Sequence, residues 1–203
     1  MYLPGQRGGE ATKKLLFGEK NPCGKLAETW AKSYSDVPYG ETFSKTPIEV
    51  YKESVFVGYR YYQKTKKTVA FPFGFGLSYT TFDYSDMEIE ENDDGITVSA
   101  TITNTGSRFG AEIVELYVKA PKTGVYKPEK ELRGFTKVYL DAGESKEIKI
   151  TVNKSDLAYY NVKEKRYVLE RGEYEFQLCS DCENVKLSET VTIAGESVPS
   201  PYD

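Results

Sequence analysis

Alternation between apolar and polar residues dominates the second half of the chain. From Ile96 to Thr103, isoleucine, valine and alanine alternate with threonine and serine. This period of two is typical of a strand with one buried and one solvated face. The same alternation returns in four later stretches: Val114–Val118, Ile148–Val152, Tyr174–Leu178 and Val185–Leu187. The pattern predicts a series of short β-strands after residue 84.

Turn-forming residues separate these stretches. They are Asp94–Gly95, Asn104–Gly106, Asp141–Gly143 and Arg171–Gly172, and each contains the glycine that tight turns favour. No segment after residue 84 shows the period of a long helix. Roughly seven strands in about 110 residues are typical of an immunoglobulin-like or fibronectin type III-like sandwich. We therefore predict a mainly β fold, with such a β-sandwich over residues 84–196.

The first 83 residues follow another pattern. Gly9–Phe17 contains helix formers with Ala11, Leu15 and Leu16 on one side, and Gly18 is suited to cap its end. Residues 19–55 hold three prolines and little periodicity, which predicts a long irregular segment. One helix cannot bury its apolar face alone. Residues 1–83 are thus predicted to be an incomplete α/β segment, with its sheet outside the chain, followed by an aromatic linker.

The segment FPFGFGLSYT, residues 71–80, joins the two parts. Its aromatic residues alternate with proline and glycine, which predicts an extended segment pressed closely against another backbone. A solvated linker would not carry so many aromatic rings. We predict that this segment is an interdomain clasp formed by Phe71, Phe73, Gly74, Phe75, Gly76 and Tyr79.

Composition narrows the function classes. The 203 residues are 39% hydrophobic and 14% aromatic, which is sufficient for at least one core. The formal net charge is −4, and without a basic stripe no nucleic acid is expected as a partner. The densest basic stretch, Lys64–Lys67, is interpreted as a solvated turn. Neither a long apolar run nor a leader pattern after Met1 is present, so we expect no membrane partner and a cytoplasmic location.

Cysteine and histidine usage limits the chemistry further. The chain has three cysteines, Cys23, Cys179 and Cys182, and no histidine. An odd number of cysteines, in a sequence without a visible secretion signal, favours a reducing compartment for the protein. Cys179 and Cys182 have CxxC spacing, but a tetrahedral zinc site would lack further ligands. We interpret them as two small residues in a turn, and we expect no metal, no other cofactor and no histidine-dependent nucleophile.

Six segments resemble, in the same order, glycoside hydrolase family 3. They are PGQRGGEA (4–11), LLFGEKNPCGKLAETW (15–30), VGYRYY (57–62), FPFGFGLSYTTF (71–82), TNTGSRFGAEIVELYV (103–118) and KELRGFTKVYLDAGESKEI (130–148). The resemblance covers most of residues 4–180, and the chain is similar to part of a β-glucosidase of that family. It implies that residues 1–83 are the end of the family's α/β sandwich domain. Residues 84–196 would then be its fibronectin type III-like domain, and the (β/α)8-type barrel would lie outside the chain.

No catalytic residue is expected within the chain. A retaining glycosidase needs two carboxyl groups about 5–5.5 Å apart across the scissile bond. The resemblance implies a nucleophile on the barrel and an acid/base upstream of PGQRGGEA, and neither motif has a counterpart here. The remaining carboxylates are interpreted as surface or helix-end charges: Glu10, Glu28, Glu41, Glu53, Glu112, Glu115 and Glu129.

The first functional hypothesis is a non-catalytic portion of a family 3 β-glucosidase-like enzyme, which supports the catalytic domains and is inactive alone. Trp30, Tyr59 and Tyr61 are candidates to line outer substrate subsites because aromatic faces stack on sugars; packing between domains is the alternative for Trp30. The second hypothesis is a free-standing carbohydrate-binding or protein-interaction module. Expected partners are the remaining domains of the enzyme, β-glucosides and a second copy of the chain.

The sequence GKLAET at residues 24–29 also resembles the corresponding motif of a subgroup of the family in which the barrel is the last domain. Residues 197–203 would then begin a linker into that barrel. Sequencing the DNA on both sides of the 203 codons tests this expectation, and stop codons directly at both ends would contradict it.

Overall fold

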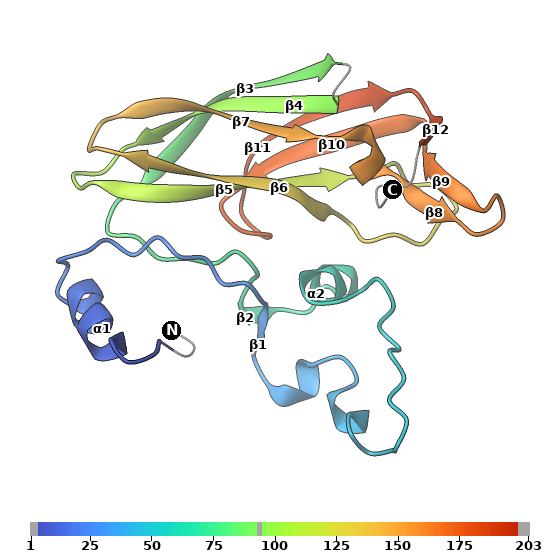
Figure 1. The fold of residues 1–203 in the computed structure, drawn as a ribbon, viewed down its shortest axis with the longest axis horizontal. Helices are drawn as coiled ribbons and strands as arrows, with labels where there is room; N and C mark the ends of the chain where they lie inside the picture. Colours follow the sequence, from blue (N-terminus) through green and yellow to red (C-terminus); the bar gives the residue numbers. More distant parts are fainter. Residues whose placement is uncertain (1–3, 93–94, 199–203) are drawn as a thin grey trace.

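The computed structural model describes residues 4–92 and 95–198, and its largest part is a β-sandwich (Figure 1). One sheet has the strand order β11-β10-β5-β6, and the facing sheet has the order β3-β4-β7. The bounds of these strands are β3 Phe82–Asn92, β4 Gly95–Asn104, β5 Gly110–Lys119, β6 Glu131–Leu140, β7 Ser145–Val152, β10 Gly172–Cys179 and β11 Val185–Ile193. The predicted mainly β fold with a sandwich is confirmed.

Side chains of one parity fill the space between the two sheets. Ile96, Val98, Ala100 and Ile102 of β4 are at most 1% exposed, as their alternation predicts. Buried residues of β5, β7 and β10 complete this core. Burial of each large aliphatic side chain contributes about 1.5–3 kcal/mol. A slip of one residue would turn the whole set to solvent, so the buried parity determines the register.

The edge strand β11 departs from the predicted alternation. Val185 is 43% exposed, whereas Leu187 and Val191 are partly buried against the core. The pairing of β10 with β11 shifts register between Leu178 and Cys179. Because this irregularity falls at the start of β11, the prediction of a buried Val185 is wrong.

Two of the predicted turns connect strands as expected. Asn104–Gly106 begins at the last residue of β4, and Asp141–Gly143 lies between β6 and β7, where Gly143 has a φ of 77°. Asp94, which belongs to another predicted turn, lies outside the described residues.

A small third sheet lies at one end of the sandwich (Figure 1). Its order is β12-β9-β8, with bounds β8 Tyr159–Asn161, β9 Arg166–Leu169 and β12 Glu196–Val198, and a short helix η3 (Lys154–Leu157) precedes it. Ser197 and Val198, which the sequence assigns to the tail, therefore pair with β9. Residues 199–203 of that tail lie outside the described residues.

The N-terminal segment lies beneath the sheet that contains β5 and β6 (Figure 1). Its elements are α1 Gly8–Leu16, β1 Trp30–Ala31, η1 Tyr34–Asp36, η2 Gly40–Thr42, α2 Tyr59–Thr65 and β2 Val69–Phe71. Gly18 follows α1 with a φ of 71°, and its N–H bonds to the Leu15 carbonyl at 3.1 Å, so the predicted cap is present. In the described part of the chain, no helix has the length and apolar character that crossing a membrane requires.

Two local predictions for this segment are wrong. Lys64 belongs to α2 and Lys66 caps that helix with a φ of 54°, so Lys64–Lys67 is a helix end rather than a separate turn. The segment after Phe71 is not extended throughout, because a turn bonds the Phe75 N–H to the Pro72 carbonyl at 3.1 Å. Gly74 takes a φ of 83° in this turn, which glycine adopts without strain.

Strand β5 is buried on both faces. Val114, Leu116 and Val118 point into the sandwich, and Glu115 and Tyr117 on the opposite parity are only 4% and 0% exposed. The sequence alone predicts a solvated outer face for such a strand. The N-terminal segment covers that face, so side chains of both parts of the chain meet at β5.

Candidate functional site

An aromatic cluster joins the N-terminal segment to the sandwich. We call residues 56–80 the strap. The ring of Tyr59 on α2 lies 5.2 Å from that of Phe73 and 5.7 Å, edge-on, from that of Tyr117 on β5. The Tyr59 hydroxyl accepts the Leu132 N–H of β6 at 2.8 Å. The strap is therefore attached to two neighbouring strands of one sheet.

A buried carboxyl group lies beneath the turn of the strap. A β-carbon at Gly74 would lie 2.4 Å from a carboxylate oxygen of Glu115, so any side chain there would have to displace that carboxyl group. Burial raises the pKa of Glu115 to about 7, although the hydrogen bond from Tyr117 and the charge of Lys25 lower it. The Tyr117 hydroxyl donates to Glu115 Oε2 at 2.7 Å. The ionised form of the Glu115 carboxyl group is therefore disfavoured at the place where the strap contacts β5.

Backbone hydrogen bonds hold the strap on both sides. The Gly74 N–H donates to the Leu26 carbonyl, and the Leu26 N–H donates to the Phe75 carbonyl, both at 2.8 Å. The Cys182 N–H donates to the Phe73 carbonyl at 3.0 Å. A β-carbon at Gly76 would lie 2.7 Å from the Gly24 carbonyl oxygen. The predicted close approach to another backbone is thus found at Gly76.

A second carboxyl group, Glu112, lies at the end of the sandwich core. Lys25 reaches it at 3.2 Å, and the Tyr84 hydroxyl donates to it at 2.9 Å. Glu112 shares the parity of the core side chains, whereas Glu115 points to the outer face, so the two carboxyl groups cannot flank one glycosidic bond. The cavity beside Glu112 is about 30 Å³, which holds about one water molecule. These buried acids therefore do not form a glycosidase site.

Cys179 and Cys182 are free and buried. Cys179 is the last residue of β10, and Cys182 lies in the turn that follows. Burial raises the pKa of Cys179 to about 11 and that of Cys182 to about 12. Since the thiolate is the reactive form, both thiols are inert at neutral pH. Across residues 4–92 and 95–198, no group of three His, Cys, Asp or Glu side chains is arranged to hold a metal ion.

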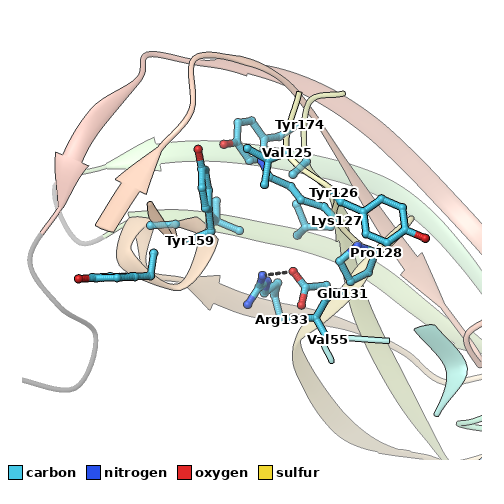
Figure 2. A pocket seen from close by; sticks show the side chains of 14 residues that line it. Val55, Val125, Tyr126, Lys127, Pro128, Glu131, Arg133, Tyr159 and Tyr174 are labelled. Atoms are coloured by element: carbon cyan, nitrogen blue, oxygen red, sulfur yellow. Dashed lines mark hydrogen bonds and ion pairs between the residues drawn. The ribbon is translucent and has the colours of Figure 1, made fainter. Parts of the chain in front are cut away.

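The candidate ligand site is a cavity of about 440 Å³ at the end of the sandwich near the third sheet. Figure 2 shows Tyr159 on one side of it and Tyr126 with Pro128 on the other, with the paired Glu131 and Arg133 between them. Val55 from the N-terminal segment also contributes to the wall. Its walls combine apolar and tyrosine side chains with three charged groups, Lys127, Glu131 and Arg133. A cavity of this volume is typical of small-molecule sites.

The charged groups at this cavity are paired with one another. Glu131 pairs with Arg133 at 2.5 Å and with Arg60 of α2 at 3.2 Å. Lys127 pairs with Glu170 and lies 4.6 Å from the centre of the Tyr159 ring. Of these five groups, three are positive and two are negative, so together they carry a charge of +1.

The three residues proposed from sequence to line substrate subsites are not gathered in one place. Tyr59 is 9% exposed and packs against β5. Tyr61 is two positions further along α2, on a different side of the helix, where it contacts Tyr62 and Lys67. Trp30 is 47% exposed, and its ring lies edge-on, 6.4 Å from Phe71. Their role in substrate binding stays a prediction.

The proposed clasp residues divide into two groups. Phe73 and Gly74 contact the sandwich. Phe71 lies 4.9 Å from Phe75 and beside Trp30, and the Tyr79 hydroxyl donates to the Leu15 carbonyl at 2.8 Å. The contacts of Phe71 with Trp30 and of Tyr79 with Leu15 fasten the strap to the earlier part of the N-terminal segment.

The tyrosines of the 440 Å³ cavity were missed in the sequence, where most tyrosines are interpreted as structural. Tyr126 lies in the connection between β5 and β6, whereas Tyr160 belongs to the short strand β8, and they are 69% and 50% exposed. An aromatic residue in a connection, rather than at a buried strand position, is the signal that could have indicated Tyr126.

Comparison with known proteins agrees with this architecture. Residues 1–79 match the glycosyl hydrolase family 3 C-terminal domain, and residues 112–182 match a fibronectin type III-like domain. The covered sandwich and these matches identify two parts of the chain: one like the C-terminal domain of glycosyl hydrolase family 3, the other like a fibronectin type III domain.

Individual relatives identify the family. Thermostable β-glucosidase B of Acetivibrio thermocellus is 44% identical over 95% of this chain, which covers 26% of that protein. An exo-α-(1→6)-L-arabinopyranosidase of Bifidobacterium breve is 38% identical over 98% of the chain and 27% of its own length. The structure of β-glucosidase 3B from Thermotoga neapolitana, in complex with α-D-glucose, superposes with a TM-score of 0.89 at 39% identity, over 95% of this chain and 28% of the other.

The chain belongs to glycoside hydrolase family 3. It spans about a quarter of the length of these relatives and is a non-catalytic portion of such an enzyme.

Proposed function

We propose that the chain supports the catalytic domains of a β-glucosidase-like family 3 enzyme and docks onto them through its N-terminal segment. The observation that carries this proposal is the contrast between the two sides of that segment. Part of it is packed on β5, and elsewhere it leaves large apolar side chains exposed: Leu16, Phe17, Tyr34, Phe43, Ile48, Val50, Tyr51 and Leu77. Large apolar side chains left exposed in this number are typical of a segment that a partner covers.

The predicted core side of α1 supports the same conclusion. Leu16 is 73% exposed and Leu15 only partly buried, so the apolar side of the helix has no cover within the described residues. The remaining part of the α/β domain would provide that cover. In the isolated chain, the same surface is expected to bind a second copy, which sedimentation measurements at increasing concentration would detect.

The substrate is proposed at the level of glycosides only. Relatives that match nearly the whole chain include β-glucosidases and exo-α-(1→6)-L-arabinopyranosidases. Since one region accompanies enzymes of both names, specificity for the sugar would reside in the parts of the enzyme outside this chain. A β-glucoside remains our proposed substrate because relatives that match most of the chain carry the name β-glucosidase.

A domain replacement tests this function. The matching 197-residue segment of the Acetivibrio thermocellus enzyme is exchanged for this chain, and turnover of p-nitrophenyl β-glucoside is measured. The chain alone is expected to show no turnover, and the chimaera is expected to be active. Enzyme-like turnover by the isolated chain, or a folded chimaera without activity, would contradict the proposal.

A further inference from the structure

We propose that Glu115 and the turn of the strap above it, residues 72–75, form a pH-sensitive latch. The turn covers the carboxyl group while that group is protonated and lifts from it when the group ionises. The inference rests on contacts within the chain and not on the docking function proposed above.

Glu115 is a buried carboxyl group without a cationic partner. It is 4% exposed, and the Tyr117 hydroxyl donates to it at 2.7 Å. The ammonium group of Lys25 lies nearby, but it pairs with Glu112 at 3.2 Å and donates to the Ser180 carbonyl at 2.8 Å. Within residues 4–92 and 95–198, Glu115 forms no ion pair. An ionised carboxylate in this position therefore lacks the pairing that a buried charge requires.

The turn of the strap excludes water from both oxygens of this carboxyl group. A β-carbon at Gly74 would lie 2.4 Å from one carboxylate oxygen of Glu115 and 2.5 Å from the other, so the backbone of the turn lies directly against them. When the turn lifts, both oxygens become hydrated and the ionised form loses its desolvation cost. Ionisation of Glu115 and opening of the turn thus favour each other.

Titratable and charged side chains surround Glu115 and its partner Tyr117 from every element packed against them: Lys25 of the N-terminal segment, Tyr59 of α2, Tyr84 of β3, Glu112 of β5, Lys130 before β6, Cys179 of β10, and Asp181 and Cys182 of the turn after β10. Burial raises the pKa of Glu115 to about 7, and the negative charges of Asp181 and Glu112 act in the same direction. Asp181 itself accepts the N–H groups of Glu183 and Asn184 at 2.9 and 3.0 Å.

The thiol and phenol groups of this surrounding do not compete with Glu115 for protons near neutral pH. Burial raises the pKa of Cys179 to about 11 and that of Cys182 to about 12. Burial also raises the pKa values of Tyr84 and Tyr117 well above their ordinary value of 10. These four groups therefore stay protonated between about pH 5 and 8.

The turn can open while the rest of the strap stays in place. Backbone hydrogen bonds hold the turn, to Leu26 on one side and to Cys182 on the other. Helix α2 is attached independently, since the Tyr59 hydroxyl accepts the Leu132 N–H at 2.8 Å and the Tyr59 ring packs edge-on against Tyr117. Opening of the turn breaks its own backbone bonds and leaves those contacts of α2 intact.

The test measures hydrogen exchange of the complete chain by NMR between about pH 5 and 8. Protection factors remove the intrinsic pH dependence of exchange and give an opening constant for each amide. The reporters are the N–H groups of Gly74, Leu26 and Cys182, whose bonds hold the turn. Their opening constants are expected to rise by up to about tenfold per pH unit between pH 4.5 and 7 and to level off above 7.

Glu115→Gln removes the titrating group. In this variant, the opening constants of the three reporter amides should vary by less than about twofold over the same pH range. Glu88→Gln is the matched control, because it makes the same change of charge at an exposed position of β3, and it should retain the pH dependence of the unaltered chain. NMR titration of the Glu115 carboxyl carbon needs no variant, and we expect a midpoint of about 7.

Three outcomes would overturn the proposal. The first is a titration of the Glu115 carboxyl group at its ordinary value of 4.5. The second is a set of reporter opening constants that do not change with pH, or that change equally in Glu115→Gln. The third is the same opening constant for Gly74 and Leu132 at every pH, which would show that the turn opens only together with the whole strap. An inactive chimaera would leave these measurements unaffected, so the latch and the docking function fail independently.

Discussion

Two glycines of the strap lie where a side chain has no room. A β-carbon at Gly74 would meet the Glu115 carboxylate at 2.4 Å, and one at Gly76 would meet the Gly24 carbonyl at 2.7 Å. Gly74 also has a φ of 83°, which a β-branched residue does not tolerate. At the residue scale, the attachment of the strap depends on these missing side chains.

Gly74→Val and Gly76→Val are therefore expected to destabilise the chain by about 2–4 kcal/mol, through strain and lost strap contacts. Urea denaturation measures the change in the free energy of unfolding. Gly124→Val is the control, because no heavy atom lies within 4 Å of its β-carbon position, and its effect should stay within about 0.5 kcal/mol. Equal stability of all three variants would show that the strap is not a clasp.

Glu115 makes stability dependent on pH. Burial raises its pKa in the folded chain to about 7, above the ordinary value of 4.5. The protonated form is thus favoured by folding, so the contribution is fully present below pH 4.5 and is lost as the pH rises through 7. Glu115→Gln stays neutral and still accepts the Tyr117 hydroxyl.

We expect Glu115→Gln to gain stability relative to the unaltered chain as the pH rises from 4.5 to 7, measured by urea denaturation at several pH values. Glu88→Gln, at an exposed position of β3, should show no such trend. If the difference between Glu115→Gln and the unaltered chain is the same at every pH, Glu115 does not titrate in this range.

At the scale of elements, Asn104 at the end of β4 connects three parts of the fold. Its side chain is fully buried. The amide oxygen accepts the Thr80 hydroxyl at 2.6 Å, and the amide nitrogen donates to the carbonyls of Arg108 and Leu140 at 2.8 and 3.1 Å. One side chain thus joins the end of the strap to the connection before β5 and to β6.

Asn104→Ala is expected to destabilise the chain by about 2 kcal/mol or more, because several buried polar groups lose their partners. Thermal unfolding followed by circular dichroism measures the effect. The matched change Asn153→Ala, at an exposed position with one side-chain bond to Asp156, should have little effect. Similar melting temperatures for the two variants would contradict the connecting role of Asn104.

At the scale of the whole molecule, the strap completes the sandwich. Glu115 and Tyr117 on the outer face of β5 are buried only because Tyr59, Phe73 and Gly74 lie over them. The sandwich and the N-terminal segment are therefore expected to unfold together rather than as separate units.

A chain shortened to residues 82–198 tests this coupling. It should unfold at a lower temperature than the complete chain and bind a hydrophobic dye, because Tyr117 and its neighbours become exposed. Removal of residues 1–20 alone takes away α1 but leaves the strap in place, so it should have a smaller effect. Equal melting temperatures for the two shortened chains would contradict the coupling.

Much of the sandwich could be predicted from local patterns. Alternation around Ile96–Ile102 identified β4 and its buried face, and Gly143 identified a turn, because strand period and turn chemistry are encoded by neighbouring residues. Helix α2 was missed because its aromatic sequence does not favour a helix, and contacts of Tyr59 with Tyr117 and Leu132 decide its conformation. The cavity was missed because its walls come from residues far apart in the chain.

By itself, the sequence determined the fold class, the family resemblance and the absence of a histidine-based site, since these depend on residue types and on their order. The tertiary structure alone decided that the outer face of β5 is covered, that the pKa of Glu115 is raised and that Tyr126, Tyr159 and Glu131 line one cavity. The physical reason is that burial, electrostatic environment and cavity shape arise from contacts between distant segments, whose partners no local pattern specifies.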